Sequence, residues 1–429
     1  MPPLDEAWWR AFGEPQLDAL IAKALADHPS LQSAEARVRA AHALVNAARA
    51  DTQPQLTGSF NTTRERFTGS DLAPLPLAGR TKTTTTLELD ASWEVDFFGR
   101  NRAALEAALG TERAAEADMQ AARTLLASNV ASGYFELARL HAQRAIAERT
   151  LAQREQILEL IQQRVRAGLD THVELRQGEG SVPEAREQIE ALDELIARAR
   201  HALAALTTQA PNALDDLTPE LRSVRAVPLP AFVPADLLAR RADIEAARER
   251  ADAALADLAV AHTQFYPSVN LAAFAGLSAV GLNDLLDPDN RQFGIGPAIH
   301  LPILDAGRLR SNYAHHSADV DAAVGAYNGA VLEAVREVAD EISTLSSIDR
   351  QQREQSAAQE AAERAFDLAL QRYSAGLGSY LTVLSVESNV LAQRRAGADL
   401  IARELVAEVA LMRALGGGYI APPALATNP

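Results

Sequence analysis

The sequence predicts a membrane α/β protein with a tandem internal repeat. Each chain is expected to contribute four strands to a shared transmembrane β-barrel of about twelve strands, which continues into a long α-helical barrel. Three observations predict this fold class: paired motifs at a fixed spacing, two helical stretches of about 67 residues, and strands with one apolar and one acidic face.

The composition is typical of long packed helices. Hydrophobic residues make up 48% of the chain but aromatic residues only 5%, because alanine and leucine supply much of the apolar content. The net charge of -16 leaves no basic face for nucleic acid. The chain has no cysteine, which excludes disulfides, thiolate catalysis and cysteine-ligated metals. No apolar run reaches the roughly 18 residues of a transmembrane helix.

Two glycine-containing motifs reveal the repeat. They read RVRAGLDTHVEL from Arg164 and RYSAGLGSYLTV from Arg372, so Gly168 and Gly376 lie 376 − 168 = 208 residues apart. A glycine inside a helix costs about 1 kcal/mol relative to alanine, so both glycines are predicted to lie in turns. FFGR and DAGR share this offset, whereas Pro54 and Pro267 differ by 213, which fits a five-residue difference in one loop.

These offsets divide the chain. We predict a first repeat over 1–210, an equatorial linker over 211–233, a second repeat over 234–418 and a C-terminal tail over 419–429. Each repeat is expected to contain, in order, a helix (17–50; 234–263), a β-hairpin (about 54–96; about 265–304), a long helix (101–167; 308–375), a tip turn (near 168; near 376) and a last helix ending near 207 or 415. A helix of about 67 residues would span roughly 100 Å, which favours a tube or an extended coiled coil.

The expected strands alternate in polarity. In LELDASWEVD, the residues Leu87, Leu89, Ala91, Trp93 and Val95 face one way, and Glu88, Asp90, Ser92, Glu94 and Asp96 face the other. A half-buried strand of a soluble protein has the same period. The length, however, matches the roughly 9–11 residues of a tilted transmembrane strand. We therefore expect Glu88, Asp90, Ser92 and Glu94 to face a wet lumen and the apolar residues to face lipid.

Four strands cannot close a barrel alone. Open strand edges are not tolerated in lipid, and small closed membrane barrels begin at about eight strands. If the strands span a membrane, several copies must share one barrel, and three copies would supply about twelve strands.

At this point the order of elements resembles a known family, the TolC-type outer-membrane efflux channels. Several segments resemble its lipoprotein subgroup, which serves resistance-nodulation-division drug pumps. They are WWRAFGEPQLDALIAKAL from Trp8, WEVDFFGR from Trp93, LPILDAGR from Leu301, RYSAGLGSYLTVL from Arg372 and ALGGGY from Ala414.

The resemblance implies a homotrimer in the outer membrane of a Gram-negative bacterium, in contact with outer-membrane lipid and extending into the periplasm. It also implies two protein partners, a periplasmic adaptor (membrane fusion protein) and an inner-membrane resistance-nodulation-division pump. Such a duct conducts drugs or other small molecules passively, without enzyme activity or cofactors, and is gated at its periplasmic tip.

The resemblance also assigns residues to roles. The tip residues are expected to contact the adaptor; they are Ala167, Gly168, Leu169, Ala375, Gly376 and Leu377. In similar channels a leucine after the turn and an acid four residues later line the gate. Leu381 matches the leucine, but Ser385 stands at the acidic position, and Glu387 is rotated away from that side of the helix. Helix termination by the glycines and ordinary packing of Leu381 are the structural alternatives.

The N-terminus departs from the subgroup pattern, because neither a signal peptide nor a cysteine for lipidation precedes Trp8. A truncated segment, a late start in the gene and true loss of the anchor would all produce this sequence.

Other charged groups make poor metal sites. His315 and His316 are adjacent in an expected helix and point about 100° apart. Glu333, Glu337, Asp340 and Glu341 have helical spacing but no Glu-x-x-His partner, which favours a solvated or lumen-facing helix.

Two alternative functions stay open: a type I secretion channel, and a soluble coiled-coil scaffold that would purify without detergent.

Overall fold

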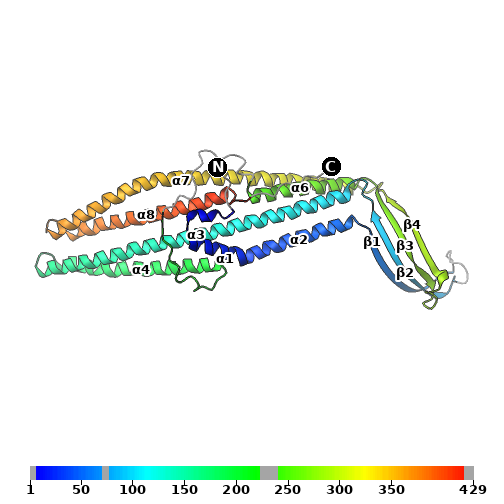
Figure 1. Ribbon diagram of the computed structural model, residues 1–429, viewed down its shortest axis with the longest axis horizontal. Helices are drawn as coiled ribbons and strands as arrows, with labels where there is room; N and C mark the ends of the chain where they lie inside the picture. The colour runs from blue at the N-terminus through cyan, green and yellow to red at the C-terminus, as the bar shows by residue number, and fades with distance from the viewer. Residues whose placement is uncertain (1–5, 70–76, 223–239, 420–429) are drawn as a thin grey trace. The chain divides into compact units, whose positions relative to one another are not determined.

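The computed structural model describes residues 6–69, 77–222 and 240–419 (Figure 1). Their helices and strands are, in chain order, η1 (Trp8–Phe12), α1 (Pro15–Asp27), α2 (Pro29–Asp51), β1 (Gln55–Arg66), β2 (Thr81–Glu94), α3 (Arg100–Arg166), α4 (His172–Leu206), α6 (Ala242–Thr263), β3 (Ser268–Val280), η2 (Pro288–Asn290), β4 (Arg291–His300), α7 (Arg308–Ser374) and α8 (Tyr380–Ala414). No described helix is both long enough and apolar enough to cross a bilayer.

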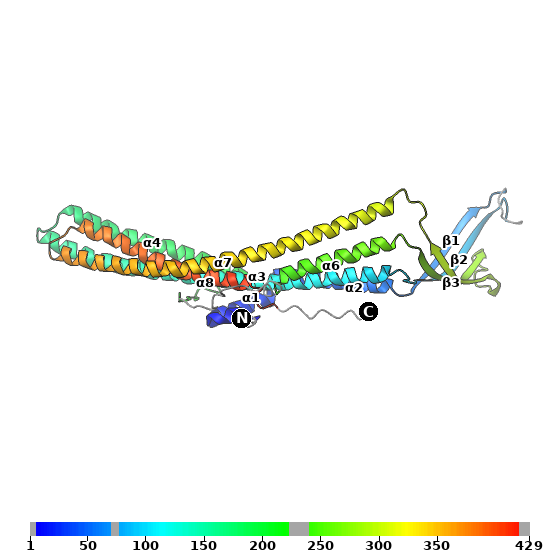
Figure 2. The ribbon, with the colours of Figure 1, turned by 90° about the horizontal axis from the view of Figure 1, so that it is seen from above.

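The described residues form two compact units, and both repeats contribute to each unit. Among the described residues, the first unit draws on 6–35, 117–222, 240–245 and 329–419, and the second on 36–69, 77–116 and 246–328. The second unit contains the sheet, and Figure 2 shows the helices of this unit reaching the sheet at one end. The turn between β3 and β4 lies at the opposite end of the strands.

The sheet has the strand order β1-β2-β3-β4, and each neighbouring pair is antiparallel. Its register confirms the tandem repeat. Leu56 lies opposite Ala91 in the first hairpin, and Val269 lies opposite Ile299 in the second. These pairs are related by the offsets read from the sequence, 269 − 56 = 213 and 299 − 91 = 208. The two hairpins therefore pair in the same register.

The long helices repeat equally closely. α3 and α7 have 67 residues each, and α4 and α8 have 35 each. Alanine-rich sequence suits such lengths because alanine has the highest helix propensity and allows neighbouring helices to approach closely.

The expectation of one helix over 17–50 is wrong in its middle. α1 ends at Asp27 and α2 begins at Pro29, with His28 extended between them at φ -68° and ψ 130°. Proline has no N–H to donate and disfavours the helical conformation in the residue before it, so the break falls at this point. The expected start of the second-repeat helix at 234 lies outside the described residues, and α6 is described from Ala242.

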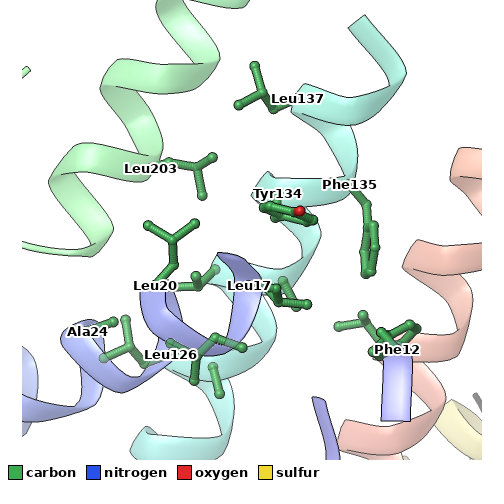
Figure 3. Close-up of a cluster of buried hydrophobic side chains, with 14 of the residues drawn as sticks. Phe12, Leu17, Leu20, Ala24, Leu126, Tyr134, Phe135, Leu137 and Leu203 are labelled. Carbon is green, nitrogen blue, oxygen red and sulfur yellow. The ribbon is translucent and has the colours of Figure 1, made fainter. Parts of the chain in front are cut away.

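The main hydrophobic core of the first unit joins α1 to the long helices (Figure 3). Leu17, Tyr134 and Leu203 are each at most 1% exposed, and Phe12 packs against Phe135 with ring centroids 5.0 Å apart. The Tyr134 hydroxyl donates to Glu14 Oε2 over 3.2 Å, which satisfies its polar end.

A second buried cluster lies near the glycine turns of the first unit. It includes Ile161 of α3, Phe366 and Tyr373 of α7, and Val383 of α8. Because this cluster joins the helices of both repeats, it fixes the two turns side by side (Figures 1 and 2).

Candidate functional site

One face of the sheet is apolar from the helix end of the strands as far as the row of Phe60 and Leu87. Beyond that row, the same face carries threonines and arginines. Residues that are paired across the strands share a face, so the register assigns every side chain. One row joins Leu56, Ala91, Ala273 and Ile295, and the next row joins Gly58, Leu89, Ala275 and Phe293. The remaining apolar side chains of this face include Phe60, Leu87, Trp93, Val269, Leu271, Leu277 and Ile299.

This apolar face is exposed within the chain. Phe293 is 84% exposed and Ile295 is 78% exposed, values typical of a surface that is covered by something other than the chain itself. On β2 the apolar positions run from Leu87 to Trp93 and continue to Val95, whose N–H donates to Val269 O over 2.9 Å. That length suits a strand crossing the hydrocarbon layer.

The opposite face is mostly polar, with Phe274 of β3 as a large apolar side chain opposite Asp90. The register places Glu88, Asp90, Ser92 and Glu94 together on it, with Thr57, Ser59, Asn270 and Gln292 beside them. The four residues expected to face a lumen therefore share one face, although their lumen-facing role stays a prediction.

Gly276 brings two strands of the polar face into contact. Glu88 of β2 and Gln292 of β4 are separated by Gly276 of β3 in the same row. Because Gly276 has no side chain, Gln292 Nε2 reaches across and donates to Glu88 Oε2 over 2.7 Å. A Cβ at position 276 would lie 2.3 Å from the Leu87 carbonyl oxygen, so only glycine fits this row.

The two tip turns have the same backbone. At the end of α3, the Leu169 N–H donates to Arg164 O and the Gly168 N–H donates to Val165 O. At the end of α7, Leu377 and Gly376 make the equivalent bonds to Arg372 and Tyr373. This pattern is a Schellman motif, which requires a left-handed residue, and the glycine φ angles are 72° at Gly168 and 75° at Gly376.

The tips have open space around them. A Cβ added at Gly168 or Gly376 would meet no atom within 4 Å. Leu169 is 66% exposed and Leu377 is 70% exposed. The structure therefore places the six expected adaptor-contact residues in two similar, accessible turns, and their contact with an adaptor stays a prediction.

A buried polar cluster, not anticipated from the sequence, holds the first turn in place. Arg164 Nε donates to Asp170 Oδ2 over 2.9 Å, and the Tyr373 hydroxyl donates to the same carboxylate oxygen. The Arg164 guanidinium also lies 4.7 Å from the centre of the Tyr373 ring. The cluster thus joins the end of α3, the turn after it and the end of α7.

The contacts of this cluster lower the pKa of Asp170. Burial opposes its ionisation, but hydrogen bonds from Arg164 and Tyr373, together with the charge of Arg164, outweigh burial and hold the pKa of Asp170 below its usual value. Burial and the bond to Asp170 raise the pKa of the Tyr373 hydroxyl, so this phenol remains a hydrogen-bond donor.

The two gate candidates lie on one side of α8. Leu381 is 63% exposed, and Ser385 is exposed one turn later. Glu387, the nearest carboxylate, is only 4% exposed and faces Arg154 of α3 at 3.3 Å. The expectation that Glu387 points away from the Leu381 side is therefore confirmed, whereas the gating role of Leu381 and Ser385 stays a prediction.

The charged groups considered for metal binding have other partners. His315 and His316 both lie 3.6 Å from Asp319, and Arg336 pairs with Glu333 and Asp340. Within residues 6–69, 77–222 and 240–419, no group of three or more histidine or acidic side chains is arranged to hold a metal ion.

Comparisons with known proteins give the family. The family model described as outer membrane efflux protein matches residues 20–209 and 233–417, so it matches each half of the chain separately. The pyoverdine export outer membrane protein OpmQ of Pseudomonas aeruginosa is 33% identical over 419 residues, covering 96% of this chain and 87% of that protein. The multidrug resistance outer membrane protein MdtQ of Escherichia coli O6:H1 is 32% identical, covering 97% and 88%.

Solved structures give the same result. The outer membrane protein VceC of Vibrio cholerae matches with a TM-score of 0.90 and 34% identity, over 97% of this chain and all of that one. The outer-membrane channel OprN matches with a TM-score of 0.91 and 28% identity, over 97% and 93%. These findings support an export channel and contradict the soluble scaffold. The chain therefore belongs to the outer membrane efflux protein family and is an efflux channel of the Gram-negative outer membrane that extends into the periplasm.

Proposed function

We propose that three copies of this chain close one barrel of about twelve strands and form the exit duct of a tripartite efflux system. The observation that carries this proposal is the two-faced sheet with open edges. Among the described residues, β1 and β4 are each paired on one side only, and such edges must be closed in lipid by further strands. Joining β4 of one copy to β1 of the next closes both edges and keeps the apolar face outside.

The polar face then lines the lumen. Glu88, Asp90 and Glu94 would place carboxylates in the conduction path, which favours cationic or zwitterionic solutes over anions. Relatives named for pyoverdine export and multidrug resistance support small organic molecules as the exported class. The duct conducts passively and carries out no covalent chemistry.

The gate belongs at the periplasmic tips in this proposal. Leu381 and Ser385 are exposed on one side of α8, so three copies would bring three such pairs around a common axis. The open glycine turns, with Leu169 and Leu377 exposed beside them, offer apolar contacts to a periplasmic adaptor. The adaptor would link the duct to an inner-membrane resistance-nodulation-division pump, which supplies the energy.

Two neighbouring residues test the orientation of the sheet. Ile295 lies in the middle of the apolar face, and Gly296 lies on the polar face with no atom within 4 Å of an added Cβ. An arginine facing mid-bilayer lipid costs about 2–4 kcal/mol, whereas a lumen-facing arginine remains in water. We expect Ile295→Arg to remove the protein from the outer-membrane fraction and Gly296→Arg to leave it there.

The functional readout is export and conductance. The wild-type protein should run in native mass spectrometry as three chains of 46.0 kDa and conduct ions in planar bilayers. It should also restore drug export to a strain lacking its efflux channels. A detergent-free monomer without conductance, or equal behaviour of Ile295→Arg and Gly296→Arg, would contradict the proposal.

A further inference from the structure

Three arginines lie on the apolar face of the sheet. Arg64 and Arg66 of β1 occupy the same face as Leu56 and Phe60, and Arg291 of β4 lies in the row of Phe60, Leu87 and Leu277. All three arginines are exposed. None of the three has an ion-pair partner among the described parts of the chain. An unpaired cation on a lipid-facing surface is costly away from the membrane boundary, so these residues require an explanation.

The arginines occupy one end of the strands. Arg64 and Arg66 end β1 next to the hairpin connection, and Arg291 begins β4 after the other hairpin connection. The helices of this unit join the sheet at the opposite end (Figure 2). Because the helices extend into the periplasm, the arginines lie at the outer surface of the membrane.

The repeat predicts where the arginines of neighbouring copies meet; this step rests on the proposed trimer. Within the chain, Thr85 of β2 lies opposite Ala279 of β3. The offsets of 208 and 213 convert this pair into Phe293 of one copy opposite Arg66 of the next, because 85 + 208 = 293 and 279 − 213 = 66. Arg291 is two residues from Phe293 on the same face, so it becomes a diagonal neighbour of Arg66.

We propose that each seam, where β4 of one copy meets β1 of the next, binds the phosphate groups of lipid A, the phosphorylated glycolipid of the outer leaflet. Arg64 and Arg66 of one copy and Arg291 of the next surround the site. Guanidinium groups bind phosphate through paired, charge-assisted hydrogen bonds. Their aliphatic stems lie along the apolar face while the charged ends reach the head-group level, where anionic lipid attracts them.

The matched control lies on the same hairpin. Lys82 of β2 is paired with Glu65 on the polar face, and Arg80 lies two residues before Lys82 in the chain. The variant Arg80→Gln/Lys82→Gln therefore removes as many positive charges as Arg64→Gln/Arg66→Gln. The probes are lipid A with both phosphates and the same lipid after enzymatic dephosphorylation. Native mass spectrometry of the detergent-purified protein reports the number of chains and the bound lipid together.

We expect the wild-type trimer to retain phosphorylated lipid A and to lose the dephosphorylated form. Each basic residue near an anionic surface strengthens the binding constant for anionic lipid by a factor of about five. Arg64→Gln/Arg66→Gln should therefore weaken the binding of phosphorylated lipid A about thirtyfold, and Arg291→Gln about fivefold. Arg80→Gln/Lys82→Gln should bind like the wild type.

Two results would overturn the proposal while leaving the trimer intact: equal binding by both double variants, or equal binding of both lipids. A third result, dissociation of the Arg64→Gln/Arg66→Gln variant into monomers in phosphate-free detergent, would show that the arginines pair with acids of the neighbouring copy instead. Failure of the wild-type protein to form a trimer would contradict the proposed function itself and is recognised by mass alone.

Discussion

At the scale of single residues, α8 shows how one helix combines an exposed and a buried role. Leu381 is exposed, whereas Glu387 is buried and hydrogen-bonded to Arg154. The same guanidinium donates to Ser181 O over 2.8 Å and to Glu184 Oε2 over 2.9 Å. Arg154 therefore links α3, α4 and α8 through one side chain.

The Arg154–Glu387 pair yields a stability prediction. Arg154→Met leaves the Glu387 carboxylate buried without its cation, which should cost about 3 kcal/mol, whereas Arg154→Met/Glu387→Met replaces the pair by apolar groups and should cost less. Glu184 is 60% exposed, so Glu184→Gln should cost under about 1 kcal/mol. Urea unfolding followed by circular dichroism measures all three, and a double variant less stable than Arg154→Met would contradict this account.

The direction in which the stability of Arg154→Met changes with pH follows from the burial of Glu387. Burial raises the pKa of Glu387, and Arg154 offsets part of that rise. Without Arg154 the pKa rises further, so the folded variant binds the proton more tightly than the unfolded chain. The variant therefore loses stability as pH rises through the folded pKa of Glu387. Its loss of unfolding free energy relative to the wild type should shrink as pH is lowered towards the ordinary glutamate pKa of about 4.3.

Leu381 carries a prediction about conduction. If it narrows the tip of the trimer, Leu381→Ala removes an apolar side chain from the narrowest part and should increase single-channel conductance in planar bilayers. Leu368 of α7 is 60% exposed and is not a gate candidate, so Leu368→Ala is the matched control. Unchanged conductance in Leu381→Ala would remove Leu381 from the gate.

At the scale of elements, the two tip turns share a backbone but differ in chemistry. Arg164 of the first repeat corresponds to Arg372 of the second at the 208-residue offset, but Asp170 corresponds to Gly378. Arg372 is exposed and donates to the Leu377 carbonyl oxygen over 3.3 Å. The repeat therefore gives both turns the same backbone. Only the first turn has a carboxylate that accepts a hydrogen bond from Tyr373, so side-chain contacts of this kind stabilise only that turn.

The Asp170 cluster predicts that the first tip turn is less stable at acidic pH. The folded pKa of Asp170 is lowered, so its contribution is complete above the ordinary aspartate pKa of about 3.9 and is lost as pH falls through the folded value. We expect Asp170→Asn to lower hydrogen-exchange protection of residues 160–180 about thirtyfold at pH 6, from the loss of hydrogen bonds to a charged group. The difference from wild type should diminish towards pH 3.

The control for this prediction is an exposed ion pair on α7. Glu360 pairs with Arg364, and their side chains are 64% and 73% exposed, so Glu360→Gln should change protection by less than about threefold. Protection in Asp170→Asn equal to that in Glu360→Gln would show that the cluster does not fasten the turn.

The elements that could be predicted from the sequence are those set by local chemistry. Gly168 and Gly376 mark turns because their backbone is left-handed, and alternation along Leu87–Val95 marks a two-faced strand. The helix break at Pro29 was also readable, because the residue before a proline avoids helical backbone. Periodicity alone does not show this break, because the apolar spacing continues across it.

The side-chain clusters could not be predicted in this way. Arg154 and Glu387 are 233 residues apart, and Asp170 and Tyr373 are 203 apart. A single sequence shows which of these residues carry charge, but it does not show which segments pack together. The pairing of Gln292 with Glu88 likewise depends on a register that becomes readable only after the offsets are applied to the strands.

At the scale of the whole molecule, the repeat also predicts the join between copies. The observed pairing of β2 with β3 joins one repeat to the other. In the proposed trimer, a join of β4 to the next copy's β1 would be the equivalent of this pairing. Ala91 lies opposite Ala273, so offsets of 208 and 213 place Ile299 of one copy opposite Phe60 of the next. Both residues lie on the apolar face, as a closed barrel requires.

Because the chain has no cysteine, this register can be tested by cross-linking. We expect Phe60→Cys/Ile299→Cys to form disulfides between copies under mild oxidation and to give a covalent trimer on denaturing gels. Phe60→Cys/Ala298→Cys is the matched control, because Ala298 is the neighbouring residue but faces the polar side. Equal cross-linking of both variants would mean that β4 and β1 are not held in one register, and efficient cross-linking of the control alone would mean a shift by one residue. A shift by one residue would reverse the faces at the seam, and either outcome would contradict a barrel built by simple continuation of the repeat.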